Sequence, residues 1–339
     1  MDFSIGDERQ MLADSLRRTL ERGVDWAGLA ELGVIGALFS EDEGGFGGAG
    51  VDISVVFQEL GRAGCALPVL EAGLAGGLLA DAGKADLVEA IIGGETRATA
   101  ALHEPGRRYD LTPAATTAEG GKLTGRKTAV GGADEAGLIV VSALEDGKPG
   151  LWLVQAGAEG LTLYTTPALQ GGTVSEITLD GVSAEKLSVD FAALDARIAA
   201  ATLAVCAEGL GAMETVRDLT LDYLRTRKQF GVPIGKFQAL QHRMADVVIE
   251  IEQARSAVIN LAGHLHAEPA LRDRHVSAAK NLMGRVARQV LEESIQLHGG
   301  IAVTEEYALA PFARRLTAFD HRFGDEDFHL ERFIMLTAA

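Results

Sequence analysis

The sequence has few cysteines, and this excludes two kinds of small stabilised scaffold. Only Cys65 and Cys206 occur among the 339 residues, and they form no Cys-x-x-Cys pair. Neither a disulfide framework nor a cysteine-based zinc ribbon can be built from two such residues. We therefore expect a reducing compartment, and we predict that the protein is cytoplasmic.

Positive charge is also scarce. The chain has 31 Lys and Arg against 48 Asp and Glu, which gives a net charge of −17. Because binding to nucleic acid needs clustered cations that release counterions, no nucleic-acid partner is expected. No apolar run approaches the roughly 18 residues of a membrane span, and the segment Met1–Glu8 is acidic where a signal peptide would be basic. We expect no association with a membrane.

What the sequence does have is a large apolar fraction arranged in regular patterns. Hydrophobic residues make up 47% of the chain and charged residues 23%. These values are ordinary for a soluble globular protein with a large core, and they exclude intrinsic disorder.

Hydrophobic spacing divides the chain into three parts. Apolar residues recur every three or four positions over residues 7–32 and 51–98, which predicts helices on either side of a glycine-dense loop at 41–50. That loop is either a flexible connector or part of a site. Short alternating runs between turn residues follow at 138–141, 151–154, 161–164 and 177–179, and they predict a small antiparallel β unit.

Helical spacing returns after residue 190. Stripes through Leu203 and Leu240 predict two long helices, a third is predicted over about 276–298, and a fourth from about Leu330. We predict an α+β fold that is mostly helical, with an N-terminal helical domain (1–96), a middle β domain (97–190) and a C-terminal four-helix bundle (191–339).

Two segments place glycine and hydrogen-bonding side chains at predicted helix ends. An Arg fork can hold a pyrophosphate by two contacts, an amide can bond adenine or ribose edges, and paired glycines let backbone approach a ligand. Either segment can equally be a plain helix end, with Gly231 or Gly299 as a C-cap. The candidate dinucleotide-binding residues are Arg227, Gln229, Phe230, Gln238, Gln296, Gly299 and Gly300.

Together and in this order, the two segments resemble the acyl-CoA dehydrogenase family, whose bundle carries Arg-x-Gln-Phe-Gly and later Gln-x-x-Gly-Gly. Residues 32–61 resemble the family's N-terminal helical domain, and Glu104-Pro105-Gly106 resembles its Thr-Glu-Pro turn. The resemblance implies FAD as cofactor and removal of an α-proton and a β-hydride from an acyl-CoA thioester, giving the 2-enoyl-CoA. It also implies that both segments reach FAD held mainly by a neighbouring subunit, with an electron-transferring flavoprotein as acceptor.

The sequence departs from the family on the other side of the site. Ala129 and Gly131 stand where the flavin-facing strand normally carries an aromatic residue and then Thr or Ser. Alignment on Arg332 puts Asp325 at the position of the catalytic base, but Asp325 can equally be a helix N-cap.

A chain that keeps the bundle motifs and loses its own flavin face resembles the shorter subunit of heteromeric enzymes that shorten sterol side chains. We therefore predict an α2β2 acyl-CoA dehydrogenase with a second, related subunit, acting on a bulky or sterol side-chain acyl-CoA. One alternative is a scaffold subunit that binds no FAD. Another is a self-sufficient homotetramer with Asp325 as its base.

No metal site is predicted. A di-iron bundle needs Glu-x-x-His on two helices, and Glu326-Asp327-Phe328-His329 is the one instance in the sequence. The pair His264 and His266 lacks matching acids or cysteines, so solvated histidines at a helix end are the favoured interpretation.

Overall fold

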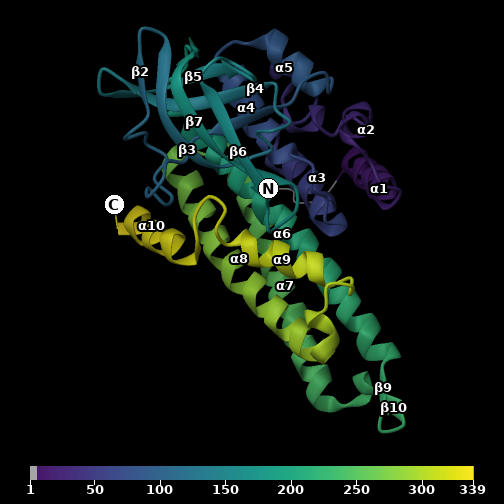
Figure 1. The fold of residues 1–339 in the computed structure, drawn as a ribbon. Helices are drawn as coiled ribbons and strands as arrows, with labels where there is room; N and C mark the ends of the chain where they lie inside the picture. Colours follow the sequence, from purple (N-terminus) through teal and green to yellow (C-terminus); the bar gives the residue numbers. More distant parts are fainter. Residues whose placement is uncertain (1–5, 339) are drawn as a thin grey trace.

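The computed structural model describes residues 6–338. Residues 1–5, which carry most of the acidic N-terminal segment considered above, and residue 339 lie outside the described part. A β sheet and a group of short helices form one end of the molecule, and long helices run from there to the other end (Figure 1). The predicted fold class is confirmed in this arrangement.

The first part of the chain folds into five helices, where the spacing predicted two long helical stretches. Left-handed glycines end these stretches early, with Gly23 at φ +80°, Gly64 at φ +66° and Gly83 at φ +71°. The helices predicted over 7–32 and 51–98 are present, but these breaks divide them, and the second stretch ends at Ile92, before the first strand. The helices are α1 (Asp7–Glu21), α2 (Trp26–Glu31), α3 (Gly50–Ala63), α4 (Val69–Asp81) and α5 (Ala85–Ile92), with 3-10 turns at Gly36–Leu38 and Glu41–Glu43.

The glycine-dense loop at 41–50 packs tightly on the turn before it. A Cβ at Gly45 would lie 2.3 Å from the Phe39 carbonyl oxygen, and one at Gly47 would lie 2.2 Å from that of Ala37. Glycine is therefore required sterically here, and the loop is not a loose connector.

The middle part forms one eight-stranded sheet in the order β6-β7-β3-β2-β4-β5-β8, with β1 beside β4. Its strands are β1 (Ala98–Ala101), β2 (Thr117–Glu119), β3 (Lys122–Gly131), β4 (Leu138–Glu145), β5 (Lys148–Gln155), β6 (Leu161–Pro167), β7 (Thr173–Ser183) and β8 (Glu185–Lys186). The predicted antiparallel pairing is right for β3–β7, β4–β5 and β6–β7, but β1 and β2 both pair in parallel with β4. The reason is the long connection from β1 to β4, which brings the chain back in the same direction.

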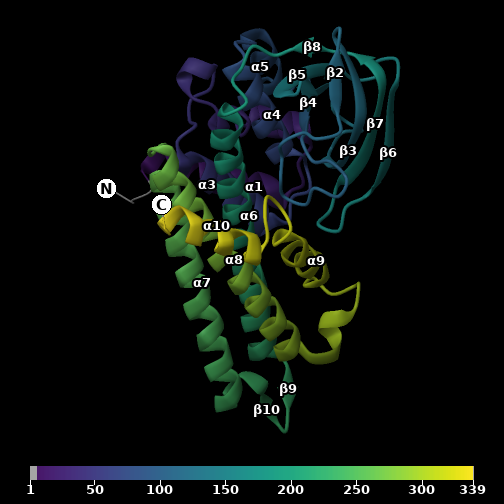
Figure 2. The same ribbon diagram turned by 90° about the vertical axis from the view of Figure 1, so that its left-hand side faces the viewer.

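The last part is built on three long helices, α6 (Ala193–Thr226), α7 (Gln238–His264) and α8 (Pro269–His298), with two short helices, α9 (Ala310–Phe319) and α10 (Glu326–Ala338), across them (Figure 2). A small hairpin of β9 (Lys228–Gln229) and β10 (Val232–Pro233) joins α6 to α7, and 3-10 turns cover Ile234–Lys236 and Gly299–Val303. The third helix begins earlier than predicted, α10 begins at Glu326 rather than near Leu330, and α9 was not predicted.

Helix α6 contains a longer apolar run than the sequence analysis recognised. Among the described residues it is the one helix long and apolar enough to cross a membrane, but 78% of its apolar window is buried inside the protein. The run is therefore the core helix of the fold, and its apolarity serves packing.

Helices α3 and α6 touch through their backbones. A Cβ at Gly61 would lie 1.9 Å from the carbonyl oxygen of Glu208, and a Cβ at Gly211 would lie 1.9 Å from that of Gln58. Each helix thus supplies a glycine to the crossing, and no larger residue fits at either position.

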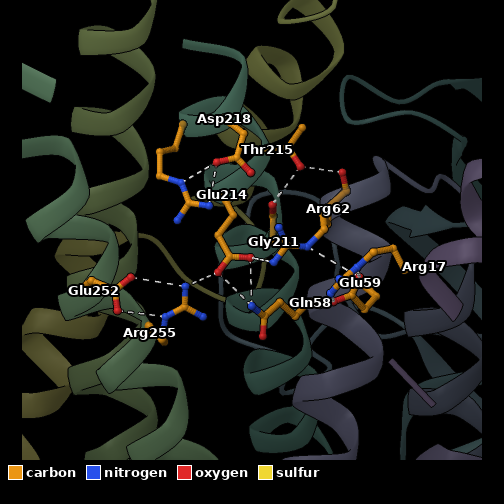
Figure 3. Close-up of polar contacts among 11 residues, drawn as sticks. Arg17, Gln58, Glu59, Arg62, Gly211, Glu214, Thr215, Asp218, Glu252 and Arg255 are labelled. Atoms are coloured by element: carbon orange, nitrogen blue, oxygen red, sulfur yellow. Dashed lines mark hydrogen bonds and ion pairs between the residues drawn. The ribbon is translucent and has the colours of Figure 1, made fainter. Parts of the chain in front are cut away.

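A buried carboxylate fixes this crossing from one side (Figure 3). Glu214 on α6 is 1% exposed and accepts hydrogen bonds from Gln58 and Arg62 on α3 and from Arg255 on α7. The Thr215 hydroxyl donates to the Arg62 carbonyl at 2.7 Å. One side chain of α6 therefore holds two other helices.

We predict that Gly61→Ala destabilises the protein strongly, because the added methyl group meets a backbone carbonyl that cannot move aside. Overpacking of this kind typically costs about 1–3 kcal/mol, and we expect the upper end here. The matched control is Gly73→Ala on α4, where the new methyl group meets the flexible end of Leu38 at 3.1 Å. Thermal unfolding of the two variants checks the prediction, and equal unfolding temperatures would contradict it.

Candidate cofactor-binding site

The first motif lies where α6 gives way to the β9–β10 hairpin. Arg227 ends the helix with an extended ψ of 123°, its N–H donates to the Tyr223 carbonyl at 2.9 Å, and its own carbonyl accepts from Ile234 N–H at 2.8 Å. Phe230 (φ +54°) and Gly231 (φ +82°) make the two-residue turn, as expected for a type I′ hairpin. Gly231 is thus a hairpin residue, and the interpretation of it as a helix C-cap was wrong.

The second motif lies at the end of α8. Gly299 is the C-cap of this helix, with φ +69° and ψ −149°. A Cβ at Gly299 or at Gly300 would meet nothing within 4 Å. The chain itself does not fill the space beside these two glycines, so a ligand can approach their backbone.

The fold brings the two motifs to the same end of the bundle. The rings of Tyr223, one turn before Arg227, and His298, directly before Gly299, lie 4.7 Å apart between centroids. Gln238 begins α7 at this end, and the rings of Phe230 and Phe237 lie 6.1 Å apart. We call residues 227–238 and 296–303 together the bundle tip.

The bundle tip is open to its surroundings. All seven candidate residues are exposed, and Phe230 is 90% exposed. Within residues 6–338 no carboxylate forms an ion pair with Arg227. An uncommitted guanidinium, exposed amides and accessible glycine backbone are the donors that a pyrophosphate and an adenosine need.

The large cavity of the chain lies elsewhere. It has a volume of about 910 Å³ and opens between α4, the sheet and the segment after α9, where Glu71, Gly131 and Arg322 line it. None of the seven candidate residues lines it. Glu208, also on its wall, precedes Arg227 along α6 by a helix length of about 28 Å at 1.5 Å per residue. The cavity and the bundle tip of one chain therefore do not form a single pocket.

Charged side chains occupy one wall of this cavity. Glu208 lies between Arg315, whose guanidinium also donates to the carbonyls of Gly64 and Cys65, and Arg322, which donates to Glu208 at 2.8 Å. The sequence analysis missed this cluster. Its members come from α6, α9 and the segment after α9, and no local sequence motif predicts that these side chains form ion pairs.

Asp325 lies at the start of α10 and does not line the cavity. Its Oδ1 accepts the Phe328 N–H at 2.9 Å, and its Oδ2 accepts the Tyr109 hydroxyl at 3.0 Å and an Arg108 N–H at 3.1 Å. Partial burial raises the pKa of this carboxyl, but the Phe328 N–H, Tyr109 and Arg108 outweigh that effect and leave the pKa below its usual value. This geometry favours the N-cap interpretation over the base.

Glu104 also has a structural role. Its carboxylate accepts the backbone N–H groups of residues 114–116 and the ammonium of fully buried Lys127 at 3.0 Å. Burial raises the pKa of Glu104, but these donors lower it to about 2 overall. The turn that resembles the family's Thr-Glu-Pro segment is thus anchored inside the β part.

Comparison with known proteins agrees with the motifs at the bundle tip. Residues 7–94 match the description "Acyl-CoA dehydrogenase, N-terminal domain", and residues 191–335 match "Acyl-CoA dehydrogenase, C-terminal domain". The acyl-CoA dehydrogenase IpdE2 of Mycobacterium tuberculosis is 31% identical over 328 residues, which cover 91% of each chain. The chain belongs to the acyl-CoA dehydrogenase family. The predicted fold class, the oxidoreductase activity on acyl-CoA and the FAD cofactor of this family are thereby confirmed.

Two solved structures of acyl-CoA dehydrogenases are similar over the whole chain. A variant of the steroid ACAD Tcur3481–Tcur3483 has a TM-score of 0.89 and 28% identity, with 99% of both chains covered. The ChsE4–ChsE5 complex from Mycobacterium tuberculosis has a TM-score of 0.89 and 25% identity, with 100% of this chain and 99% of that chain covered.

The chain's own β face is a poor fit for the flavin of an acyl-CoA dehydrogenase. A Cβ at Gly131 would lie 2.5 Å from a carboxylate oxygen of Glu71, which reaches over the strand and forms an ion pair with Arg322 at 3.8 Å. Burial raises the pKa of Glu71. Ala129 offers no ring, and its φ of +55° places it at an irregularity in the β3–β7 pairing. The carboxyl group of Glu71 therefore occupies the space where the family's Thr or Ser side chain would lie.

We predict that Asp325→Ala lowers the free energy of unfolding by about 1–2 kcal/mol, because α10 loses its N-cap. Asp325→Asn keeps an oxygen for the Phe328 N–H, so it should lose less. Chemical unfolding of both variants checks this. If both variants lose the same free energy of unfolding, the N-cap hydrogen bond contributes nothing to stability.

Proposed function

We propose that this chain is one subunit of a heteromeric acyl-CoA dehydrogenase and that its bundle tip binds FAD held mainly by the β part of a partner subunit. The observation that carries the proposal is the separation of the exposed tip from the chain's own cavity. A chain with an open, uncommitted nucleotide-binding tip needs a second subunit to complete the site.

Two further observations support this division of roles. The β face of this chain meets the carboxylate of Glu71 where a flavin ring would lie, and Asp325 is held by three hydrogen bonds outside the cavity. The chain thus keeps groups suited to binding, while its candidate base, Asp325, is engaged in hydrogen bonds.

We propose a bulky or sterol side-chain acyl-CoA as substrate, with α2β2 assembly. The similar structures support this choice, since one is a steroid ACAD and the other is the ChsE4–ChsE5 complex. An electron-transferring flavoprotein as acceptor and a cytoplasmic location complete the proposal, and both follow from the family resemblance and the cysteine content.

In this scheme FAD, when bound, accepts the hydride from the β-carbon of the acyl chain. The guanidinium of Arg227 holds the pyrophosphate by two hydrogen bonds, and the amides of Gln229 and Gln296 bond the adenosine part. The backbone of Gly299 and Gly300 lets the nucleotide approach closely. The carboxylate that removes the α-proton belongs to the partner, so this chain contributes binding and orientation.

We predict that Arg227→Ala in the reconstituted assembly weakens FAD affinity about ten- to hundredfold, because a charged ligand group loses a bidentate partner worth roughly 1.5–3 kcal/mol. Flavin loss on dilution measures the effect. The matched control is Arg225→Ala, two residues earlier on α6 and equally exposed. Flavin retention that is the same in both variants would favour the scaffold alternative.

We predict that Asp325→Asn leaves turnover of the assembly nearly unchanged, since the partner supplies the base. Loss of a true general base would reduce kcat on the order of a hundredfold or more. Steady-state turnover at measured flavin content distinguishes the two. If turnover disappears while flavin stays bound, this chain carries the base and the shared-site proposal is wrong.

A further inference from the structure

His298 belongs to the second motif of the bundle tip, and its position in the sequence alone indicates no role. It is the last residue of α8 and is 3% exposed, although Gly299 directly after it is exposed. Its Nδ1 lies 2.8 Å from the Ser294 carbonyl oxygen. Because a carbonyl only accepts, Nδ1 carries the proton and donates it.

The imidazole ring packs against two tyrosines from different segments. Its centroid lies 4.7 Å from that of Tyr223 on α6 and 5.1 Å from that of Tyr307, which follows the turn at Gly299–Val303. The rings of Tyr223 and Tyr307 lie 6.4 Å apart. The end of α6 and the segment 298–307, which are distant in sequence, therefore meet at one ring.

The ring contact leads directly to the first motif. The Tyr223 carbonyl accepts the Arg227 N–H, and the Arg227 carbonyl accepts the Ile234 N–H across the base of the hairpin. Beyond this base the hairpin is open, as the 90% exposure of Phe230 shows. The orientation of Arg227 thus depends on how the end of α6 is held.

Histidine is not the residue that packing alone would favour here. Its Nε2 is buried and has no hydrogen-bond partner within 3.5 Å among the described residues, although the backbone of Leu219 also interacts with this imidazole. A buried unpaired acceptor costs about 1–3 kcal/mol, which an apolar ring of similar shape would avoid. Compared with an apolar ring, histidine adds the Nδ1–H group, and this group holds the end of α8.

We propose that His298 is a positioning residue that fixes the two motifs of the bundle tip in one arrangement. Its ring holds the end of α6, from which Arg227 projects, and its Nδ1–H holds the end of α8, from which Gly299 and Gly300 project. The link to FAD rests on the proposed function above. A shift of about 1 Å between groups that must contact one ligand can cost on the order of a hundredfold.

The test compares three substitutions of His298 by hydrogen exchange over residues 223–237 in the full chain. His298→Ala should speed exchange at the hairpin base about tenfold, because the ring that supports Tyr223 is gone. His298→Phe should restore most of the protection, since it keeps a ring. His298→Gln should not restore it, because it has a hydrogen-bond donor and no ring.

The chain offers a matched control at the opposite end of the bundle. His264 is the last residue of α7, and its Nδ1 also contacts the carbonyl four residues earlier, that of Asn260, at 2.8 Å. His264→Ala should leave the exchange of residues 223–237 unchanged. If His298→Ala also leaves it unchanged, or if His298→Phe fails to rescue it, the proposal is overturned.

Flavin retention in the assembly separates this proposal from the proposed function. We expect His298→Ala to lower FAD affinity at least tenfold and His298→Phe to lower it less. Thermal unfolding should show that both variants are folded. Faster exchange with unchanged flavin affinity would leave the positioning role intact and contradict the use of the bundle tip for FAD.

Discussion

The backbone contact between α3 and α6 is the constraint on which the rest of the structure depends. Gly61 and Gly211 let the two helices touch, and the carboxylate of Glu214 lies buried beside the contact. A buried carboxylate is strongly unfavourable unless it is paired and hydrogen-bonded, so Arg62, Arg255 and Gln58 must hold their positions as long as Glu214 stays inside. The short N-terminal helices are thereby fixed to the bundle, and α6 becomes the axis of the molecule.

That axis supports our proposal that one chain does not complete a site by itself. Near its middle α6 supplies Glu208 to the wall of the cavity, and at its end it supplies Arg227 to the bundle tip. A straight helix keeps these two residues about 28 Å apart. Charged side chains, Glu71 and the group around Glu208, line the cavity, while the tip is exposed. In our account, cofactor binding and proton removal are divided between subunits because a rigid helix separates the cavity from the bundle tip within each subunit.

Much of this arrangement could be predicted from local sequence signals. The period of apolar residues locates the helical and β parts, and the spacing of Arg227 to Phe230 and of Gln296 to Gly300 identifies the family. The breaks at Gly23 and Gly64 were missed because an apolar stripe continues across them, although the backbone turns there. The parallel pairing of β1 with β4 depends on the path of a long connection, and the spacing of apolar residues does not encode that path.

The roles of single side chains depended still more on contacts between distant residues. Glu71 covers Gly131 from another element, and His298 meets Tyr223 only because α6 and α8 end at the same place. Asp325 fits a catalytic base or a helix cap equally well in the sequence, and its contacts with Tyr109 and Phe328 favour the cap. Sequence therefore identified a candidate binding motif, while the fold was needed to see which site it can serve.

The most direct test of the account is a structure of the assembly of this chain with its partner, determined with FAD bound. Our account predicts FAD against Arg227 and Gly299–Gly300 of this chain, with the flavin ring on the β part of the partner. It also predicts no flavin in this chain's own cavity beside Glu71. FAD lying over Gly131 of this chain, with Glu71 displaced, would contradict the central claim.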